Sequence, residues 1–143
     1  MSVTLSCLAT RGKGCFIVNK EGYRVKEDVF YIRTKDKDSS HLKSFIFETI
    51  LRGVRSVKDI VDHDDILIIR VQNENMVKWL NSEEVYKGYE DLMNDIFDAV
   101  DLLDCRYRYT FSKVIGDCKS LLSEEPKQEV LTGVSSIFDN LEE

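Results

Sequence analysis

The chain has 143 residues, 43% of them apolar and 32% charged, which is enough to build one domain with a buried core. No apolar run approaches the ~20 residues needed to cross a bilayer, and the N-terminus lacks the features of a signal peptide, so we expect a cytoplasmic protein. The acidic residues behind the net charge of −6 are concentrated in 82–104 and 124–143, which argues against a protein that grips a phosphate backbone, because such proteins usually carry a basic surface.

The cysteines and histidines predict no metal site and no cofactor. Cys7, Cys15, Cys105 and Cys118 form no C-x-x-C pair, and neither histidine has a cysteine or another histidine at ligand spacing. We therefore expect reduced, buried thiols. A catalytic role for Cys7 would need a base nearby, and nothing in the sequence places one there.

Three strands are expected first, in hairpin order. Residues 3–8 are short, apolar and β-branched, which is typical of a central strand. Residues 15–18 form a second apolar run, and residues 23–33 alternate between apolar and polar side chains. Turns that contain glycine separate the runs, so the three strands should be antiparallel neighbours.

A long helix and a buried strand follow. Residues 42–57 place apolar side chains at i, i+3 and i+4, which predicts an amphipathic helix. Residues 66–69 form the continuous apolar run ILII. Such a run is typical of a strand that is buried on both faces and parallel to its neighbour.

The second half of the chain predicts helices around one strand. We expect a short helix over 74–80 and a longer one over 82–103. The longer helix has one apolar face, made of Val85, Tyr89, Leu92, Ile96, Val100 and Leu103. Residues 105–111 alternate and predict a strand. A helix over 113–123 closes the domain, and a further helix over 126–141 begins at the only proline.

The resulting order is β-β-β-α-β-α-α-β-α, in an α/β domain over residues 1–123 with a C-terminal helical appendix over 124–143. Local segments support a family resemblance, above all ILIIRVQNENMVKWL at 66–80, a strand, a polar turn and an apolar helix that ends in leucine. This order and these segments resemble the ribonuclease H-like superfamily. The resemblance implies a mixed five-stranded sheet, with an antiparallel hairpin half and a parallel half, flanked by helices.

The same resemblance implies a degenerate member of the superfamily. Ribonucleases H hold two Mg²⁺ ions with four carboxylates. Carried over residue by residue, these positions fall at Cys7 or Leu8, Lys43, Gln72 and Lys119, none of which is acidic. No Asp or Glu occurs before residue 21, so no shift of the alignment supplies a carboxylate on the first strand. We therefore expect a catalytically inactive protein.

Acidic residues close to these positions do not replace the missing carboxylates. At roughly 100° per residue, Glu48 lies about 140° around its helix from Lys43, and Asp117 about 160° from Lys119. Asp65 precedes its strand and so lies at the wrong end of it.

Our first hypothesis for the function is a protein-interaction module. Residues 82–104 contain eight acidic residues and one lysine, and the acids lie opposite the apolar face. Binding candidates are Glu90, Asp91, Asp95 and Asp98 of this helix and Ile137, Phe138 and Leu141 of the appended helix. Small chains that are rich in lysine and aspartate and lack catalytic motifs resemble phage factors that regulate host transcription or replication in the host cytoplasm. The partner would then have a basic surface, as a sigma factor of the host RNA polymerase or a replication protein has.

The alternative hypothesis is a nucleic-acid-binding protein or a divergent ribonuclease H. The cationic side chains available to phosphates are Lys43, Arg106, Arg108, Lys113 and Lys119. Trp79 or Tyr109 could stack on bases, although the spacing of Trp79 from Met76 is more typical of a core residue. Binding to phosphates would weaken steeply with salt, which distinguishes this hypothesis from the first.

Overall fold

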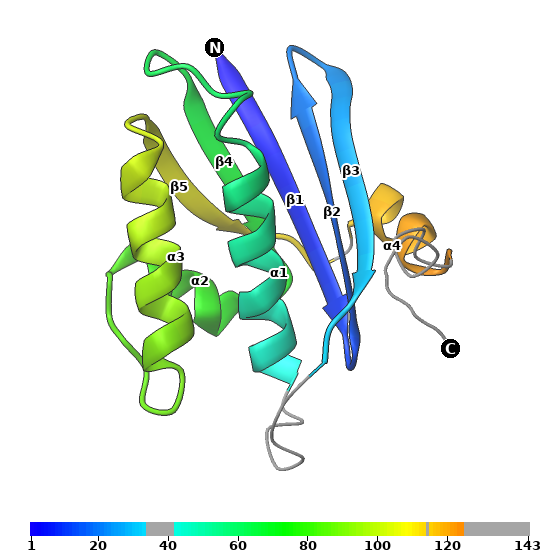
Figure 1. Ribbon diagram of the computed structural model, residues 1–143, viewed down its shortest axis with the longest axis vertical. Coiled ribbons are helices and arrows are strands. Elements are labelled where there is room, and N and C mark those ends of the chain that lie inside the picture. Colours follow the sequence, from blue (N-terminus) through cyan, green and yellow to red (C-terminus); the bar gives the residue numbers. More distant parts are fainter. Residues whose placement is uncertain (34–41, 114, 125–143) are drawn as a thin grey trace, which may run out of the picture.

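The computed structural model describes residues 1–33, 42–113 and 115–124, which form a five-stranded sheet with helices on both faces (Figure 1). The strand order is β3-β2-β1-β4-β5. The antiparallel half and the parallel half of this sheet are as the sequence predicts. The predicted helix over 126–141, with Ile137, Phe138 and Leu141, lies outside the described residues. Within the described ranges, no helix is long and apolar enough to cross a membrane.

The hairpin half consists of β1 (Ser2–Thr10), β2 (Lys13–Lys20) and β3 (Tyr23–Tyr31), each antiparallel to the next. The turns between them are tight. Gly12 and Gly22 have φ values of 85° and 83°, in the left-handed region that glycine enters without steric cost. The predicted hairpin order is therefore confirmed.

The parallel half consists of β4 (Ile66–Val71), which pairs with β1, and β5 (Arg106–Phe111), which pairs with β4. On one face of β4, Leu67, Ile69 and Val71 are fully buried. Ile66 and Ile68 on the other face are only half-buried, which corrects the expectation of burial on both faces. The reason is that the helix on that side packs on β1 and β2 instead.

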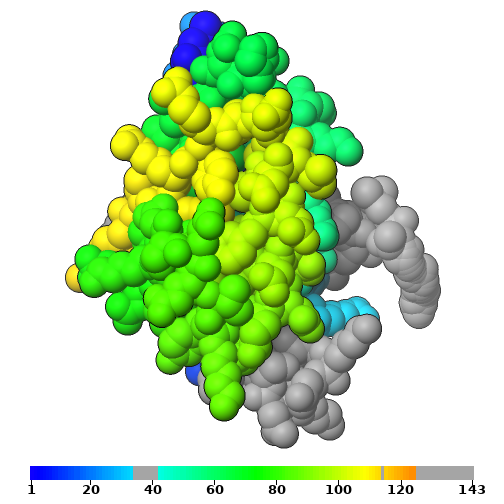
Figure 2. Space-filling model, turned by 90° about the vertical axis from the view of Figure 1, so that its left-hand side faces the viewer, coloured from blue at the N-terminus to red at the C-terminus, as the bar shows by residue number. Residues whose placement is uncertain are grey.

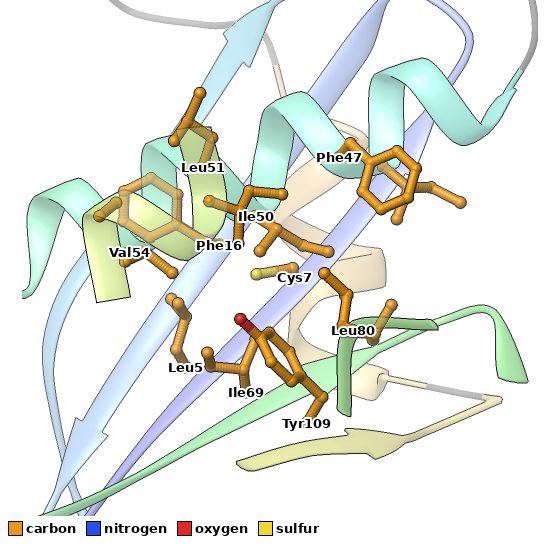
Figure 3. Close-up of a cluster of buried hydrophobic side chains, with 14 of the residues drawn as sticks. Leu5, Cys7, Phe16, Phe47, Ile50, Leu51, Val54, Ile69, Leu80 and Tyr109 are labelled. Atoms are coloured by element: carbon orange, nitrogen blue, oxygen red, sulfur yellow. The ribbon is translucent and has the colours of Figure 1, made fainter. Parts of the chain in front are cut away.

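The main core lies between the sheet and α1 (Leu42–Ser56), as Figure 3 shows. Leu5 and Cys7 of β1 point toward Ile50 and Val54 of α1 (Figure 3). The helix lies so close to β1 that a Cβ atom on Gly53 would come within 2.9 Å of the Leu5 side chain. Glycine is therefore the residue that allows this approach.

The predicted helix over 82–103 is wrong in its first two turns. The structure has α2 (Glu74–Asn81), then a non-helical segment, then α3 (Glu90–Leu102). Glu83 and Gly88 have φ values of 56° and 98°, and residues in the left-handed region do not continue a right-handed helix.

The predicted apolar face of this helix also needs correction. Val85 and Tyr86 are 40% and 46% exposed, and Tyr86 stacks on Trp79 with ring centroids 3.9 Å apart. Trp79 is consequently half-buried at the edge of the core. Leu92 and Leu103 are half-buried as well, whereas Met93 and Ile96 fill the core from α3.

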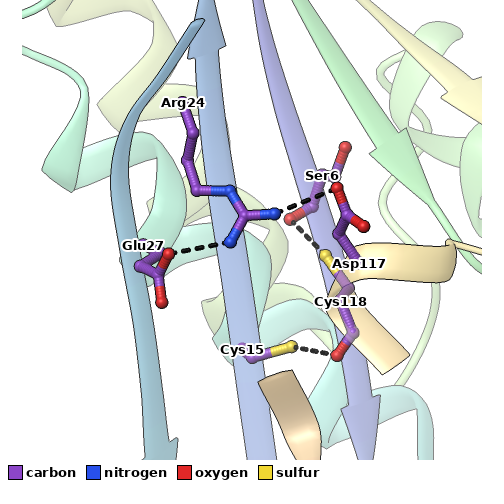
Figure 4. A network of polar contacts seen from close by, with 6 residues as sticks. All are labelled: Ser6, Cys15, Arg24, Glu27, Asp117 and Cys118. Atoms are coloured by element: carbon purple, nitrogen blue, oxygen red, sulfur yellow. Dashed lines mark hydrogen bonds and ion pairs between the residues drawn. The ribbon is translucent and has the colours of Figure 1, made fainter. Parts of the chain in front are cut away.

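The other face of the sheet is covered at β1 and β2 by α4 (Gly116–Leu122), which is shorter than the predicted helix over 113–123. Its attachment is shown in Figure 4. The Cys15 thiol donates to the Cys118 carbonyl at 3.2 Å, and the Cys118 thiol donates to the Ser6 carbonyl at 3.4 Å. Arg24 of β3 adds an ion pair with Asp117 at 3.0 Å. All four cysteines are free, and only Cys105 is not fully buried.

Candidate functional site

The carboxyl ends of the parallel strands β1 and β4 meet at one edge of the sheet, where the resemblance places the metal site. Gln72 follows the last residue of β4 and reaches across to β1. Its side-chain oxygen accepts a hydrogen bond from the Ala9 N–H at 2.6 Å, and its side-chain nitrogen donates to the Ala9 carbonyl at 3.0 Å. Both the oxygen and the nitrogen of the side-chain amide are thus hydrogen-bonded to the backbone of β1.

The other positions are more widely distributed. Cys7 is 2% exposed within the main core, where burial raises the pKa of its thiol well above the usual range. Leu8 points to the opposite face and packs against the core under α4. Lys43 is in the first turn of α1 and Lys119 is on α4, and these two helices cover opposite faces of the sheet. Of the positions outside β1, Gln72 is the one whose side chain forms hydrogen bonds to this strand among the described residues.

These side chains do not form a ligand set for Mg²⁺. They offer one amide oxygen, already bonded to Ala9, and the ammonium groups of Lys43 and Lys119, which repel a cation. Hard divalent cations bind oxygen ligands, preferably carboxylates. Within residues 1–33, 42–113 and 115–124, no group of three or more His, Cys, Asp or Glu side chains could hold a metal ion.

The neighbouring acids have other contacts. Glu48 lies 3.7 Å from Arg52 of the same helix, and Asp117 is 78% exposed in its ion pair with Arg24. Asp65 lies at the opposite end of β4 from Gln72, as predicted. Its carboxylate accepts from the Asp62 N–H at 2.9 Å and lies 3.4 Å from the Lys20 ammonium, and both contacts lower the pKa of Asp65.

Solved structures with the same arrangement of strands and helices identify the fold. A structure of LC11-RNase H1 in complex with an RNA/DNA hybrid covers 90% of this chain and 98% of its own, with 13% identity and a TM-score of 0.58. The chain has the ribonuclease H-like fold. Its strand order and both halves of its sheet are those expected from the resemblance.

Two further structures agree with this ribonuclease H-like fold. The N-terminal RNase H domain of a Mycobacterium tuberculosis protein covers 84% of this chain and 92% of its own, with 8% identity and a TM-score of 0.56. RNase H1 from Halobacterium salinarum covers 78% and 83%, with 13% identity and a TM-score of 0.51. No protein-family model and no curated protein sequence matches the chain.

The predicted acidic candidates lie together on the outer surface of α3. We call Glu90, Asp91, Asp95 and Asp98 the acidic face, and all four are exposed. Figure 2 shows this side of the molecule, where α3 and the 82–89 segment form the surface. Glu90 accepts a hydrogen bond from the Gly88 N–H at 2.9 Å. No member of the acidic face forms an ion pair with another described residue.

The predicted cationic candidates of β5 lie on the side of the sheet opposite α1. Arg106 and Arg108 are exposed there, and the structure adds Arg70 of β4, which the sequence did not single out. Arg70 donates to the hydroxyls of Ser6 at 3.3 Å and Ser112 at 2.9 Å. We call Arg70, Arg106 and Arg108 the arginine face. Lys113, just beyond β5, is also exposed.

Of the two aromatic candidates for base stacking, Tyr109 is buried and Trp79 is partly covered. Tyr109 is 3% exposed, and its hydroxyl is buried without a hydrogen-bond partner among the described residues. Burial raises the pKa of Tyr109. One ring face of Trp79 is covered by Tyr86. The period of a strand places Tyr109 on the core side, so this outcome follows from the alternation already visible in the sequence.

A second amide forms the same type of contact at the edge of the sheet. Asn81, the last residue of α2, donates to the Tyr109 carbonyl at 2.9 Å and accepts from the Tyr109 N–H at 3.1 Å. The sequence gives no sign of this contact, because it joins residues 28 positions apart. Side-chain amides thus bond the backbone of two strands, Gln72 near the end of β1 and Asn81 in the middle of β5.

Proposed function

We propose that this chain is a catalytically inactive ribonuclease H-like protein that acts as a binding module for another protein. The observation that carries the proposal is Gln72, whose amide bonds both the N–H and the carbonyl of Ala9. A carboxylate cannot donate to a carbonyl, so this position serves the sheet in a way that a metal ligand could not. At a position where the resemblance implies a metal ligand, the Gln72 side chain thus has a structural role instead.

Charge supports the same proposal. The central strand β1 contains no Asp or Glu, and Lys43 and Lys119 stand where the resemblance implies carboxylates. Two Mg²⁺ ions activate water and stabilise the leaving oxygen only when anionic ligands hold them close together. Lysines at such positions would oppose cation binding by direct repulsion.

We expect the protein not to hydrolyse an RNA/DNA hybrid in Mg²⁺ or Mn²⁺, because the ligand set for the metals is missing. The measurement is gel analysis of a labelled hybrid, with an active ribonuclease H as the positive control for each metal. Cleavage that persists through purification and is lost in Glu48→Gln, Asp65→Asn or Asp117→Asn would contradict the proposal.

The acidic face supports a protein partner with a basic surface. Its carboxylates are exposed and without ion pairs among the described residues, and Asp91 and Asp95 are like charges at i, i+4. Such charges attract and orient a complementary surface during encounter. A DNA-binding protein of a host, such as a sigma factor of RNA polymerase or a replication protein, carries basic surface of this kind.

We expect lysine substitutions at Glu90 and Asp91 to slow association with the partner at least several-fold while leaving the fold intact. The partner is first captured and identified by mass spectrometry, and its association rate is then measured by surface plasmon resonance. Lysine at Glu21 and Asp64, both exposed and outside the acidic face, gives the same change of net charge as a control. Equal rates for the two variants would show that α3 is only a solvated surface.

The arginine face supports a second candidate function, binding of a nucleic acid or another polyanion. Arg106 and Arg108 are two residues apart on β5, so their side chains emerge on one face at roughly 7 Å spacing. The net charge of −6 and the covered aromatic rings weigh against this candidate. We therefore prefer the protein partner.

A further inference from the structure

A groove runs between the C-terminal ends of α1 and α3, with a volume of about 660 Å³. Its lining residues come from these two helices and the turns that follow them: Val54, Arg55, Lys58, Asp95, Asp98, Ala99, Leu102 and Leu103. We call it the α1–α3 groove. The two helices that form it, α1 and α3, lie side by side on the face of the sheet opposite α4 (Figure 1).

Leu102 makes this groove unusual. Its side chain is 86% exposed, more than any other large hydrophobic side chain in the described part of the chain. Single exposed leucines are common on protein surfaces and need no explanation. This one, however, lies beside Val54, Ala99 and Leu103 in a concave surface, which provides an apolar centre for an interface.

The two rims of the groove carry opposite charges. Arg55 and Lys58 lie on the α1 side, and Asp95 and Asp98 lie on the α3 side. All four are exposed, and none forms an ion pair with another described residue. The charges on the two rims are therefore left for a partner to neutralise.

We propose that the occupant of the α1–α3 groove is a second copy of this chain, in a symmetric dimer. In such a dimer the same surface of each copy faces the other. A two-fold axis along the groove places the basic rim of each copy on the acidic rim of the other, so the dimer contains two such pairs of rims. An axis across the groove would instead bring acid against acid, so the charges select the first arrangement.

The same axis gives Leu102 a partner. Rotation about it carries Leu102 of each copy from the α3 side to the α1 side of the other, above Val54 and the aliphatic stems of Arg55 and Lys58. A wholly basic partner would meet Arg55 and Lys58 with like charge, which disfavours it in this groove. The dimer would occupy Asp95 and Asp98 of the acidic face, whereas Glu90 and Asp91 do not line the groove and stay accessible for the partner proposed above.

The first test measures the mass of the protein by sedimentation velocity over a range of concentrations. We expect the wild type to form a dimer that weakens as salt increases, and Leu102→Asp to be monomeric throughout. Tyr23→Asp, which introduces the same charge at a 76% exposed position on β3, should dimerise like the wild type. A wild type that stays monomeric up to its solubility limit would overturn the proposal.

The second test uses complementary variants. Asp95→Lys with Asp98→Lys makes both rims basic, and Arg55→Glu with Lys58→Glu makes both rims acidic. We expect each variant to be monomeric alone, with the circular dichroism spectrum of the wild type, and an equimolar mixture to form a heterodimer. If the mixture remains monomeric, or if each variant alone dimerises like the wild type, the proposed pairing of rims is wrong. Neither outcome depends on the partner or on nuclease activity.

Discussion

Replacing Gly14 with alanine should destabilise the protein by about 3 kcal/mol, at the upper end of what overpacking of a core costs. Gly14 lies in β2, and a Cβ atom there would overlap the Thr49 hydroxyl of α1 and come within 3.0 Å of the Phe30 ring. Thr49 cannot move away easily, because it is fully buried and its hydroxyl donates to the Phe45 carbonyl at 2.8 Å. For a chain of this length the midpoint of thermal unfolding should fall by roughly 10 °C.

A double variant tests this explanation. Thr49→Ala removes the atom that the new Cβ would strike, so Gly14→Ala combined with Thr49→Ala should be more stable than Gly14→Ala alone. Gly116→Ala is the matched control, since no atom lies within 4 Å of its Cβ position. Chemical denaturation gives the free energy of unfolding for each variant. If Gly14→Ala unfolds with the same free energy as Gly116→Ala, the close approach of β2 and α1 is wrong.

Replacing Gln72 with glutamate should cost about 2 kcal/mol at neutral pH, the penalty for leaving a buried acceptor without its donor. The Ala9 carbonyl would lose its hydrogen bond and face a carboxylate oxygen of like partial charge. A protonated carboxyl can donate to that carbonyl, so we expect the pKa of the new group to be raised above about 4.3, its usual value. With a raised pKa in the folded state, the penalty is present at pH 7 and disappears as the pH falls below about 4.

The measurement is the free energy of unfolding of wild type and Gln72→Glu between pH 3.5 and about 7, compared at each pH. Asn75→Asp is the control, because it adds the same charge at an exposed position of α2, three residues further along the chain. A penalty that does not depend on pH, or that Asn75→Asp shows equally, would mean that Gln72 does not hold β1 through its donor. The structural role of Gln72, on which the proposed function rests, would then fail.

The order of elements was predictable because each is encoded by a local pattern. Alternation and apolar runs mark the strands, and i, i+3, i+4 spacing marks α1. The same reasoning placed the start of α3 too early, at residue 82, because Val85 and Tyr89 continue the apolar spacing of this helix by coincidence. The left-handed residues Glu83 and Gly88 break it, and only Gly88 carries a visible signal in the sequence.

The candidate site was predictable only in part, because its contacts join distant positions. The family resemblance selected Gln72, but its bonds to Ala9 span 63 residues and depend on the register of β1 and β4. Arg70 carries no functional signal in the sequence, because it is a single charged residue within the otherwise apolar strand ILIIRV. The α1–α3 groove combines residues of two helices that are separate in the sequence, and no periodicity within either helix indicates their relative position.

The amide of Asn81 affects how copies of this chain can meet. A strand at the border of a sheet presents unpaired N–H and carbonyl groups, which can recruit a strand from another molecule and lead to aggregation. Asn81 occupies the N–H and carbonyl of Tyr109, in the middle of β5, and so interrupts that template. At the opposite border, β3 carries Arg24, Lys26, Glu27 and Asp28, and charged side chains discourage the same association. Uncontrolled growth of the sheet is thus opposed at both borders.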